Sequence, residues 1–329
     1  METTLSSQEN HSFLRKKAGY FFLDDLCLIS AKGSDLFSYL QTQTTNDVNE
    51  LKPGQGQNNA IVDRKARVIS TFSIHRTGEE SAFMLVEAIQ KENLLNHLNT
   101  FLFREDVTLT SSNHFLLALQ GPRSSEIIET FTQNRKSIPE KPNDIIEFTF
   151  EGQSALAIAK SLTGEEGCVL VFQTESEDTI TRKLLEFEQQ NLLIHIDHHA
   201  REVFRIESGI PSYGKDINDK NILPETGLEH SSVSYNKGCY IGQENTAKQK
   251  HRGTVRKRLV KVIIEGPSPR LGEPIKWNQT EIGTMRSSRA DAGLALIRID
   301  RWKEAKTEGA MMNAGDARIT PVKPDWASF

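Results

Sequence analysis

The chain has 329 residues, of which 37% are hydrophobic, and its formal net charge at pH 7 is −4. A chain of this length exceeds most single domains, so we expect two or three domains with sizeable cores. The slightly acidic balance argues against nonspecific nucleic-acid binding through bulk charge. No run of about 18 apolar residues occurs, so the sequence predicts no membrane span.

Cysteine usage is sparse, because Cys27, Cys168 and Cys239 lie far apart in the sequence. An odd count does not build a disulfide framework, which indicates a reducing compartment. No C-x-x-C pair is present, so we expect no self-contained zinc or iron–sulfur site and no bound metal. The polar N-terminus resembles neither a signal peptide nor an Arg-rich transit peptide. We therefore expect a cytoplasmic protein.

The first part of the chain predicts strands that cluster in pairs, with helices between the clusters. Strands are expected over 20–23, 25–30, 59–63, 68–75, 82–87, 106–110 and 115–119, and helices over 33–40, 91–103 and 124–131. The residues 20–23 and 25–30 are expected to form either a pair of strands or a strand and a turn. Residues 59–63 and 68–75 are expected to form an antiparallel pair around a basic turn. This irregular alternation favours an α+β fold over a parallel doubly wound sheet.

A polar segment with two prolines, residues 132–143, suggests a boundary between lobes. A second α+β unit follows, with strands over 145–150, 154–160 and 168–173, and helices over 179–190 and 197–208. After Gly253, short turn-separated strands indicate a small antiparallel barrel or sandwich; they cover 258–264, 274–277, 281–285, 293–299 and 317–322. We therefore predict lobes at 1–143, 144–253 and 254–329, and leave open an exchange of segments between the first two.

The stretch Lys237–Glu244 reads KGCYIGQE and places Cys239 between two glycines, which allow close approach of a ligand. Residues 245–250 are expected to form a short helix, so the thiol would lie just ahead of a helix N-terminus. That position and nearby cations, including Lys237, Lys248 and Lys250, favour the thiolate. The alternative is a tight turn around a buried, inert cysteine, and local chemistry does not separate the two.

Three other groups of polar residues suggest sites less strongly. Glu207 is expected on a helix end, where its carboxylate could accept paired hydrogen bonds from a heterocycle or serve as a surface salt-bridge partner. His195, Asp197, His198 and His199 lack metal-protease spacing, so a metal site is disfavoured. Basic residues over 64–67 and 248–258 indicate either a solvated face or a site for an anionic tail. No interleaved aromatic residues support RNA stacking.

The KGCYIGQE stretch resembles the signature of YgfZ-type folate-binding proteins, relatives of the glycine-cleavage T protein, an aminomethyltransferase (GcvT). Weaker markers follow in the order of that family. They are Leu40-Gln41, Thr45 to Val48, Pro53 to Gln55, Leu119 to Pro122, Arg205 to Pro211, Gly214 to Ile217, Pro224-Glu225 and Gly293 to Leu296. The resemblance covers nearly the whole chain, from about Gly33 to Val322.

This resemblance implies a three-lobed, GcvT-like α+β folate-binding fold with a C-terminal antiparallel β-barrel, and tetrahydrofolate as the cofactor. It implies Cys239 as the key thiol. The folate contacts that it implies are Glu207, Asn46, Asp47, Arg205, Tyr240 and Gln243. The implied role is assembly or repair of iron–sulfur clusters in client enzymes, including tRNA-thiolating ones. Expected partners are folate and these clients, with an indirect link to tRNA-modifying enzymes, and with neither a membrane nor direct nucleic-acid contact.

The chain departs from the aminomethyltransferase pattern in two places. Where that enzyme carries an aspartate, the best-aligned positions here hold Asn93 or Leu94, which puts aminomethyl transfer in doubt. Many relatives have glycine where this chain has Ala66, a change expected only to tighten the turn. Two alternative functions stay open: a tetrahydrofolate-dependent aminomethyltransferase of glycine cleavage, and a tRNA-binding or tRNA-modification factor. The sequence leaves open whether the chain is an enzyme.

Overall fold

The computed structural model describes residues 12–132, 138–252 and 255–324. These residues divide into two compact units, and each unit is built from segments that are distant in sequence. The first unit holds the described residues up to Gln41, together with Asp47–Asn59 and Phe72–Phe204. The second holds Thr42–Asn46, Ala60–Thr71 and the described residues from Arg205 onward.

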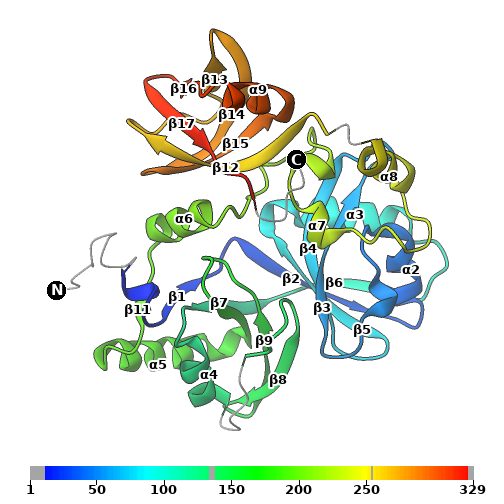
Figure 1. The fold of residues 1–329 in the computed structure, drawn as a ribbon. Coiled ribbons are helices and arrows are strands. Elements are labelled where there is room, and N and C mark those ends of the chain that lie inside the picture. The colour runs from blue at the N-terminus through cyan, green and yellow to red at the C-terminus, as the bar shows by residue number, and fades with distance from the viewer. Residues whose placement is uncertain (1–11, 133–137, 253–254, 325–329) are drawn as a thin grey trace. The chain divides into compact units, whose positions relative to one another are not determined.

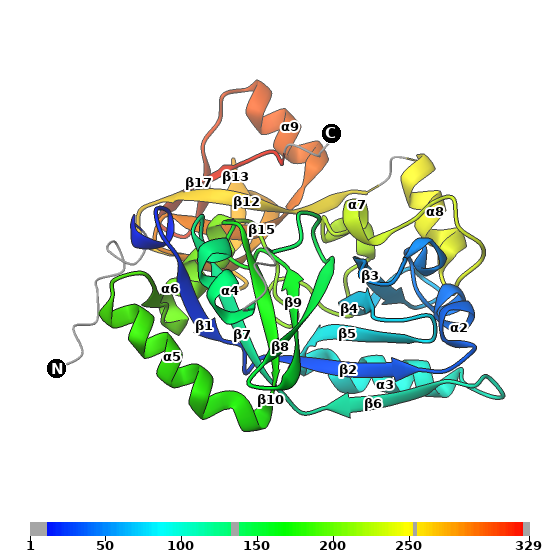
Figure 2. The same cartoon turned by 90° about the horizontal axis from the view of Figure 1, so that it is seen from below.

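A six-stranded sheet forms one half of the first unit (Figures 1 and 2). Its order is β11 (Ile194–His195), β1 (Gly19–Phe22), β7 (His114–Gln120), β10 (Gly167–Gln173), β9 (Gln153–Ala159) and β8 (Ile145–Phe150). Side chains alternate between its faces, because Leu117 and Leu119 of β7 belong to one core cluster and Leu116 belongs to another. Helices α4 (Ser124–Thr132) and α5 (Glu177–Gln189) cover the first face with Phe131 and Leu184.

A five-stranded sheet has the order β3 (Gly56–Val62), β4 (Val68–Arg76), β5 (Ser81–Glu87), β2 (Leu26–Lys32) and β6 (Thr108–Ser112). Strands β3 and β4 join across residues 63–67, as the sequence predicts. Of the two alternatives for residues 20–30, the strand pair is wrong, because β1 pairs with β7 and β11 while β2 pairs with β5 and β6. In β1, Tyr20 and Phe22 lie opposite Leu119 and Leu117. Tyr20 and Phe22 are thereby buried in a larger sheet, whereas a sheet of β1 and β2 alone would leave these side chains exposed.

The remaining helices of the first unit are short. They include α2 (Leu36–Gln43, which ends in the second unit), η1 (Val48–Glu50), η2 (Ala88–Gln90), α3 (Lys91–Thr100), η3 (Thr174–Ser176) and most of α6 (His198–Glu207). Within the part of the chain that the structure describes, no helix combines the length and apolarity needed to cross a bilayer.

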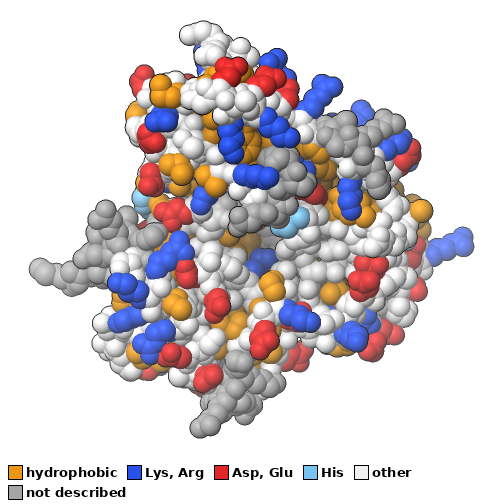
Figure 3. All heavy atoms as spheres, viewed as in Figure 1, with side chains coloured by type: hydrophobic (Ala, Val, Ile, Leu, Met, Phe, Trp, Pro, Cys, Tyr) orange, Lys and Arg blue, Asp and Glu red, His pale blue; other side chains and the backbone are white. Residues whose placement is uncertain are grey.

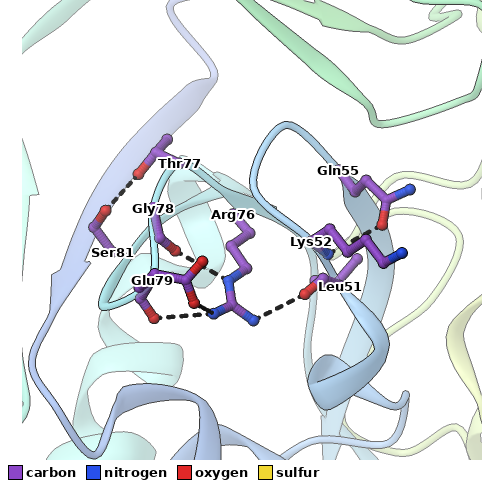
Figure 4. Close-up of polar contacts among 8 residues, drawn as sticks. All are labelled: Leu51, Lys52, Gln55, Arg76, Thr77, Gly78, Glu79 and Ser81. Atoms are coloured by element: carbon purple, nitrogen blue, oxygen red, sulfur yellow. Dashed lines mark hydrogen bonds and ion pairs between the residues drawn. The ribbon is translucent and has the colours of Figure 1, made fainter.

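Arg76 ties the end of β4 to the Pro53-Gly54 turn (Figure 4). Its guanidinium donates to the carbonyl oxygens of Leu51 (2.8 Å), Gly78 and Glu79, and it stacks 4.0 Å from the Phe37 ring centroid. Its backbone N–H donates to Gln55 O, and its carbonyl accepts from Gly54 N. A planar fork with five donors suits this multiple role. The turn marked in the sequence by Pro53-Gly54 is therefore held from the neighbouring strand.

The second unit ends in a closed antiparallel barrel, which resolves the predicted choice between a barrel and a sandwich. Its order is β12 (Lys257–Glu265), β15 (Ala292–Arg298), β14 (Thr280–Arg289), β13 (Pro274–Trp277), β16 (Met312–Ala314) and β17 (Ala317–Pro321). Inward residues such as Val262 and Ile297 fill its core together with Trp302 of α9 (Ile299–Thr307).

The rest of the second unit is rich in loops and contains short helices. These are the end of α6 (His198–Glu207), η4 (Leu223–Glu225), α7 (Glu229–Ser232) and α8 (Gln243–Arg252). A separate core cluster gathers Val62 and Val68 from the hairpin, Leu223, Tyr240 and the barrel residue Leu294. In this cluster Tyr240 of the KGCYIGQE stretch packs with Val62 and Val68, which lie almost 200 residues earlier in the sequence.

Candidate functional site

Residues 237–244, here called the thiol loop, present Cys239 to solvent. Cys239 is exposed and carries a free thiol, whereas Cys168 is buried in the core of the first unit and Cys27 is half-buried. Helix α8 begins at Gln243, so the thiol lies just before a helix, as predicted. The alternative of a buried, inert Cys239 is therefore wrong.

Lys237 anchors the thiol loop from inside the protein. Its side chain is 7% exposed, and its Nζ donates to the carbonyl oxygens of Thr44 and Asn46, each at 2.7 Å. Both carbonyls lie just beyond the C-terminal end of α2, where a cation interacts favourably with the helix dipole. The Lys237 ammonium also lies 5.3 Å from the Tyr240 ring centroid. Lys237 thus joins the loop to a chain segment 191 residues earlier.

The other cations expected around Cys239 have different partners. Lys248 pairs with Glu244, four residues earlier on α8, and the Lys250 ammonium lies 3.7 Å from the Tyr235 ring centroid. The side chains of His251 and Arg252 lie outside the described residues. The cationic residues that the sequence suggested as thiolate partners therefore serve mainly to brace the loop and helix.

Gln243 and Tyr240 shape the thiol loop. Gln243 Nε2 lies 3.2 Å from Lys237 O and 3.3 Å from Gly238 O, and donates across the loop. Tyr240 is buried in the second cluster of its unit, and this burial raises the pKa of its phenol. Both residues were predicted as folate contacts. In the structure their side chains hold the backbone on either side of Cys239.

Gly242 packs directly on the basic hairpin turn. Its φ is +87°, and a Cβ at this position would meet Asp63 O at 2.4 Å. Asp63 in turn accepts from the backbone N–H groups of Lys65 and Arg67. Asn245 donates to Arg64 O at 2.6 Å. The glycine before the helix is therefore required by close packing against the hairpin.

Asn46 lies on the segment that Lys237 contacts. Its side-chain amide donates to Ser231 O, and the neighbouring Thr45 hydroxyl donates to Ser232 O at the end of α7. Asp47 belongs to the first unit, where its carboxylate caps η1 through Asn49 N and accepts from Gln41. Thr45 and Asn46 thus hold the backbone at the end of α7, whereas Asp47 binds residues of its own segment.

Glu207 lines a cavity of about 320 Å³ in the second unit. The cavity wall also includes Lys261 of β12 and His230 of α7. Lys261 Nζ donates to the backbone carbonyl of Glu207 at 2.9 Å. The volume is at the lower end of small-molecule sites, where a few polar groups on an apolar wall orient a ligand. Glu207 therefore belongs to the wall of a cavity of small-molecule size.

Arg205 is committed to a partly buried ion pair. Its Nη1 donates to Asp216 Oδ2 at 2.7 Å, and its Nη2 donates to Ser287 Oγ on β14 at 2.8 Å. Asp216 has a fully buried carboxylate, which also accepts from the backbone N–H groups of Ser212 and Ser287. Sequence reasoning missed this role, although Asp216 stands in the marker Gly214 to Ile217. The acidic residue of that marker, Asp216, was the available signal.

The histidine group near residue 197 has a structural use. Asp197 Oδ1 accepts from Ala200 N at 2.7 Å and so caps α6. Among the residues that the structure describes, no group of three His, Cys, Asp or Glu side chains could hold a metal ion.

Comparison with known proteins identifies families and relatives that match this chain. The chain matches the family described as the GCVT N-terminal domain over residues 2–237, and the CAF17 C-terminal beta-barrel domain over residues 256–329. The aminomethyltransferase of Halalkalibacterium halodurans is 27% identical over 309 residues, covering 90% of this chain and 82% of that protein. The aminomethyltransferase of Bacillus cytotoxicus is 28% identical over 306 residues, covering 89% of this chain and 82% of that protein.

A solved structure shows the same fold. The crystal structure of the glycine cleavage system aminomethyltransferase T from Bartonella henselae matches with a TM-score of 0.84 at 19% identity. The match covers 98% of this chain and 89% of that chain. The predicted GcvT-like α+β fold with a C-terminal antiparallel barrel is therefore confirmed.

Proposed function

Because the chain belongs to the family of the GCVT N-terminal domain, we propose that it binds a tetrahydrofolate and assists assembly or repair of iron–sulfur clusters in client enzymes, including tRNA-thiolating ones. The C-terminal barrel match confirms the predicted relationship to YgfZ-type folate-binding proteins. Glu207, Asn46, Asp47, Arg205, Tyr240 and Gln243 remain our candidates for the folate site, and Cys239 for the key thiol. Arg205, Tyr240 and Gln243 would act mainly by holding the loops in place.

The observation that carries this proposal is the exposed thiol of Cys239 on a loop whose other side chains are used to brace it. An exposed cysteine on a rigid loop is accessible to a partner protein, whereas a buried one is inert. Tetrahydrofolate would supply a reduced one-carbon carrier beside Glu207. The chain itself would bind the pterin through that carboxylate and present the thiol.

Aminomethyl transfer is the second candidate, because the two curated relatives carry the name aminomethyltransferase. The residues at the aligned carboxylate position argue against it. Leu94 is fully buried on α3, and Asn93 is exposed on the same helix. Neither side chain can ionise, so no carboxylate from this position would interact with the folate N10.

A tRNA-binding role receives less support from the surface. In Figure 3, Lys and Arg side chains are interspersed with Asp and Glu over the visible face, rather than gathered into one basic tract. Phosphate binding would require such a tract and would weaken steeply with salt. A filter-binding titration with tRNA at two salt concentrations separates this alternative; tight, salt-sensitive binding would favour it.

The folate part of the proposal is tested by titrating the purified chain with tetrahydrofolate under anaerobic conditions, using intrinsic fluorescence or calorimetry. We expect saturable binding that Glu207→Ala weakens at least about ten-fold, since a charge-assisted paired contact contributes about 1.5–3 kcal/mol. Glu207→Gln keeps the shape of the side chain but loses its charge, so its affinity for tetrahydrofolate should lie between those of the wild type and Glu207→Ala. Unchanged affinity in Glu207→Ala would remove this residue from the site.

The thiol part is tested in cells that lack the natural gene. Cys239→Ala should leave the fold and folate binding intact while lowering the activity of iron–sulfur client enzymes. Cys168→Ala is the matched control, because that thiol is buried in the core. Normal client activity with Cys239→Ala would contradict the accessory role, and turnover in a glycine-cleavage assay with lipoyl carrier protein would favour aminomethyl transfer instead.

A further inference from the structure

A group of cations lies next to the thiol loop in the second unit, and the proposed folate site does not include it. Its members are exposed side chains of two segments that are far apart in sequence. They are Arg64 and Lys65 in the hairpin turn between β3 and β4, and Lys248 and Lys250 on α8, here called the cationic surface. The whole chain has a net charge of −4, so this excess of cations opposes the overall balance.

Packing contacts hold the hairpin turn against the start of α8. The side-chain amide of Asn245 donates to Arg64 O at 2.6 Å, although the two residues are 181 positions apart. Gly242 lies so close to Asp63 that a Cβ on this glycine would be 2.4 Å from Asp63 O. The cations of the turn and those of the helix therefore belong to one area, which begins at the end of the thiol loop.

The acidic side chains of this area do not cancel its positive charge, because each is matched by a cation of its own. The carboxylate of Asp63 binds the guanidinium of Arg67 at 2.7 Å, within the turn. The carboxylate of Glu244 pairs with Lys248, one turn later on α8. These two pairs leave the other cations of the surface in excess.

Three cations remain after this matching, namely Arg64, Lys65 and Lys250. Among the residues that the structure describes, no carboxylate forms an ion pair with any of the three. The Lys250 ammonium lies 3.7 Å from the ring centroid of Tyr235, a contact that orients the charge without neutralising it. The cationic surface thus presents three positive charges that an anionic partner could neutralise.

The thiol of Cys239 lies within electrostatic reach of these charges. Cys239 is exposed and stands three residues before Gly242, and three residues of chain span at most about 11 Å. Charges in water act over about 30 Å at 0.01 M ionic strength and over about 8 Å at physiological ionic strength. A molecule that approaches the thiol therefore experiences the potential of the cationic surface, and experiences it most strongly at low salt.

We propose that the cationic surface docks an acidic segment of a client protein and so brings that segment to Cys239. This inference rests on the proposed function, which presents this thiol to clients. Glutamate and aspartate side chains complement Arg64, Lys65 and Lys250. Such complementarity accelerates encounter and fixes the orientation of the partner more than it adds affinity.

The composition of the surface favours an acidic protein segment over RNA. Three cations in excess are few for a nucleic acid, whose affinity grows with the number of phosphates that the protein neutralises. Single-stranded RNA also needs aromatic rings on which its bases stack. The ring of Tyr235, next to Lys250, already has an ammonium over its face.

The test measures how fast Cys239 of the full chain reacts with two pentapeptides, each with a central cysteine activated as a 2-thiopyridyl disulfide. One peptide carries four glutamates and the other four lysines. The Cys239 thiolate attacks the peptide sulfur, a mixed disulfide forms and pyridine-2-thione leaves, which absorbance follows. Each rate is divided by the rate of the same peptide with free 2-mercaptoethanol, and the rate of the Cys239→Ala variant is subtracted as background.

We expect the glutamate peptide to react at least about five-fold faster than the lysine peptide at about 0.01 M salt, and the ratio to fall below about two at 0.5 M salt. Arg64→Glu/Lys65→Glu should abolish or reverse the preference. Arg64→Gln/Lys65→Gln removes the charges without reversing them, so its ratio should lie between those of the wild type and the glutamate variant. Lys276→Glu/Lys303→Glu, which makes the same change of charge at exposed positions of the barrel, should keep the wild-type ratio.

Equal rates for the two peptides at low salt, or the same loss of preference in the barrel variant, would overturn the proposal. Tight tRNA binding that Arg64→Glu/Lys65→Glu abolishes would assign the surface to nucleic acid and overturn it as well. The peptide assay needs neither folate nor a client enzyme. Its failure is therefore distinguishable from failure of the proposed function, which is measured by folate titration and by client activity.

Discussion

Lys237 Nζ lies 2.7 Å from the carbonyl oxygen of Asn46, and this contact fixes the thiol loop to the segment after α2. The same ammonium donates to Thr44 O at 2.7 Å. Thr44 is fully buried, so water cannot replace the lost donor if Lys237 is removed. One buried lysine therefore connects two loops that the sequence marks separately, KGCYIGQE and the polar stretch after the first helix.

Replacing Lys237 with Met should destabilise the protein by about 2–4 kcal/mol, since two charge-assisted hydrogen bonds to the buried segment after α2 are lost. Urea unfolding measures this change. The reaction rate of Cys239 with a disulfide reagent should also change, because the loop is released. Lys248→Met is the control. The ion pair of Lys248 with Glu244 is exposed, so the urea unfolding midpoint of this variant should hardly change. Equal effects from the two variants would contradict the anchoring role.

Gly242 and Gly238 flank Cys239 but should respond very differently to alanine. A Cβ on Gly242 would lie 2.4 Å from Asp63 O and 2.7 Å from Val62 Cγ2, at a φ of +87°. A Cβ on Gly238 would have no atom within 4 Å. We expect Gly242→Ala to cost about 2 kcal/mol or more through backbone strain and displacement of the hairpin.

Gly238→Ala should be almost neutral in the same unfolding experiment. It places one methyl group next to the thiol without disturbing the loop, so it also tests access to Cys239. A large loss of stability from Gly238→Ala, or none from Gly242→Ala, would show that the packing described for the hairpin is wrong.

His75 should make the protein sensitive to acid well above the range of its carboxylates. Burial, with a smaller effect from the Lys160 charge, lowers the pKa of His75 to about 3. Between that value and the ordinary pKa of about 6.5, the unfolded chain binds a proton that the native chain does not. Stability is therefore full above about pH 6.5 and is lost as pH falls, by about 1.4 kcal/mol for each pH unit.

The measurement is the free energy of unfolding in urea at pH 7 and pH 5, for the wild type and for His75→Gln. Between pH 7 and pH 5, the free energy of unfolding of the variant should fall by about 2 kcal/mol less than that of the wild type. The reason is that glutamine, unlike His75, takes up no proton when the chain unfolds. His97 and His114 also have pKa values lowered by burial, so some acid sensitivity should remain in the variant. Identical slopes for the two proteins would contradict this account.

The sequence predicted elements whose cause is local. Continuous apolar runs marked β7 and β10, and the helical pattern that ends at Gly209 marked α6. The glycines of KGCYIGQE were expected to allow close approach of a ligand, whereas the group that closely approaches Gly242 is the Asp63 carbonyl of the hairpin. Ala66 adopts a φ of +63°, which fits the expectation that a glycine commonly stands there in relatives.

Contacts over long sequence distances could not be predicted in this way. No periodicity shows that Lys237 reaches Thr44 or that Arg205 reaches Ser287, because such contacts depend on how the segments meet. The cations around Cys239 looked like thiolate partners because only their sequence proximity was visible. The same limit explains why a pair of β1 with β2 was one of the two alternatives for residues 20–30, although each strand pairs elsewhere.

Arg205 offers a test of whether a predicted folate contact is structural. Its ion pair with Asp216 has side-chain exposures of 11% and 0%, and breaking a buried pair commonly costs about 3–5 kcal/mol. Arg205→Met should lower the free energy of unfolding by about 3–5 kcal/mol, because the buried carboxylate of Asp216 then loses the guanidinium that it pairs with. Asp216→Asn in the Arg205→Met background should recover part of the loss, because the remaining buried group is neutral.

Folate titration of these variants, performed well below their melting temperatures, separates bracing from binding. If Arg205 acts by joining the loop at residues 210–216 to Ser287, the affinity of the folded double variant should stay within a few fold of the wild type. Arg298→Met is the control, because its pair with Asp300 is exposed on the barrel. A loss of folate affinity without a loss of stability in Arg205→Met would show instead that the guanidinium contacts the ligand directly.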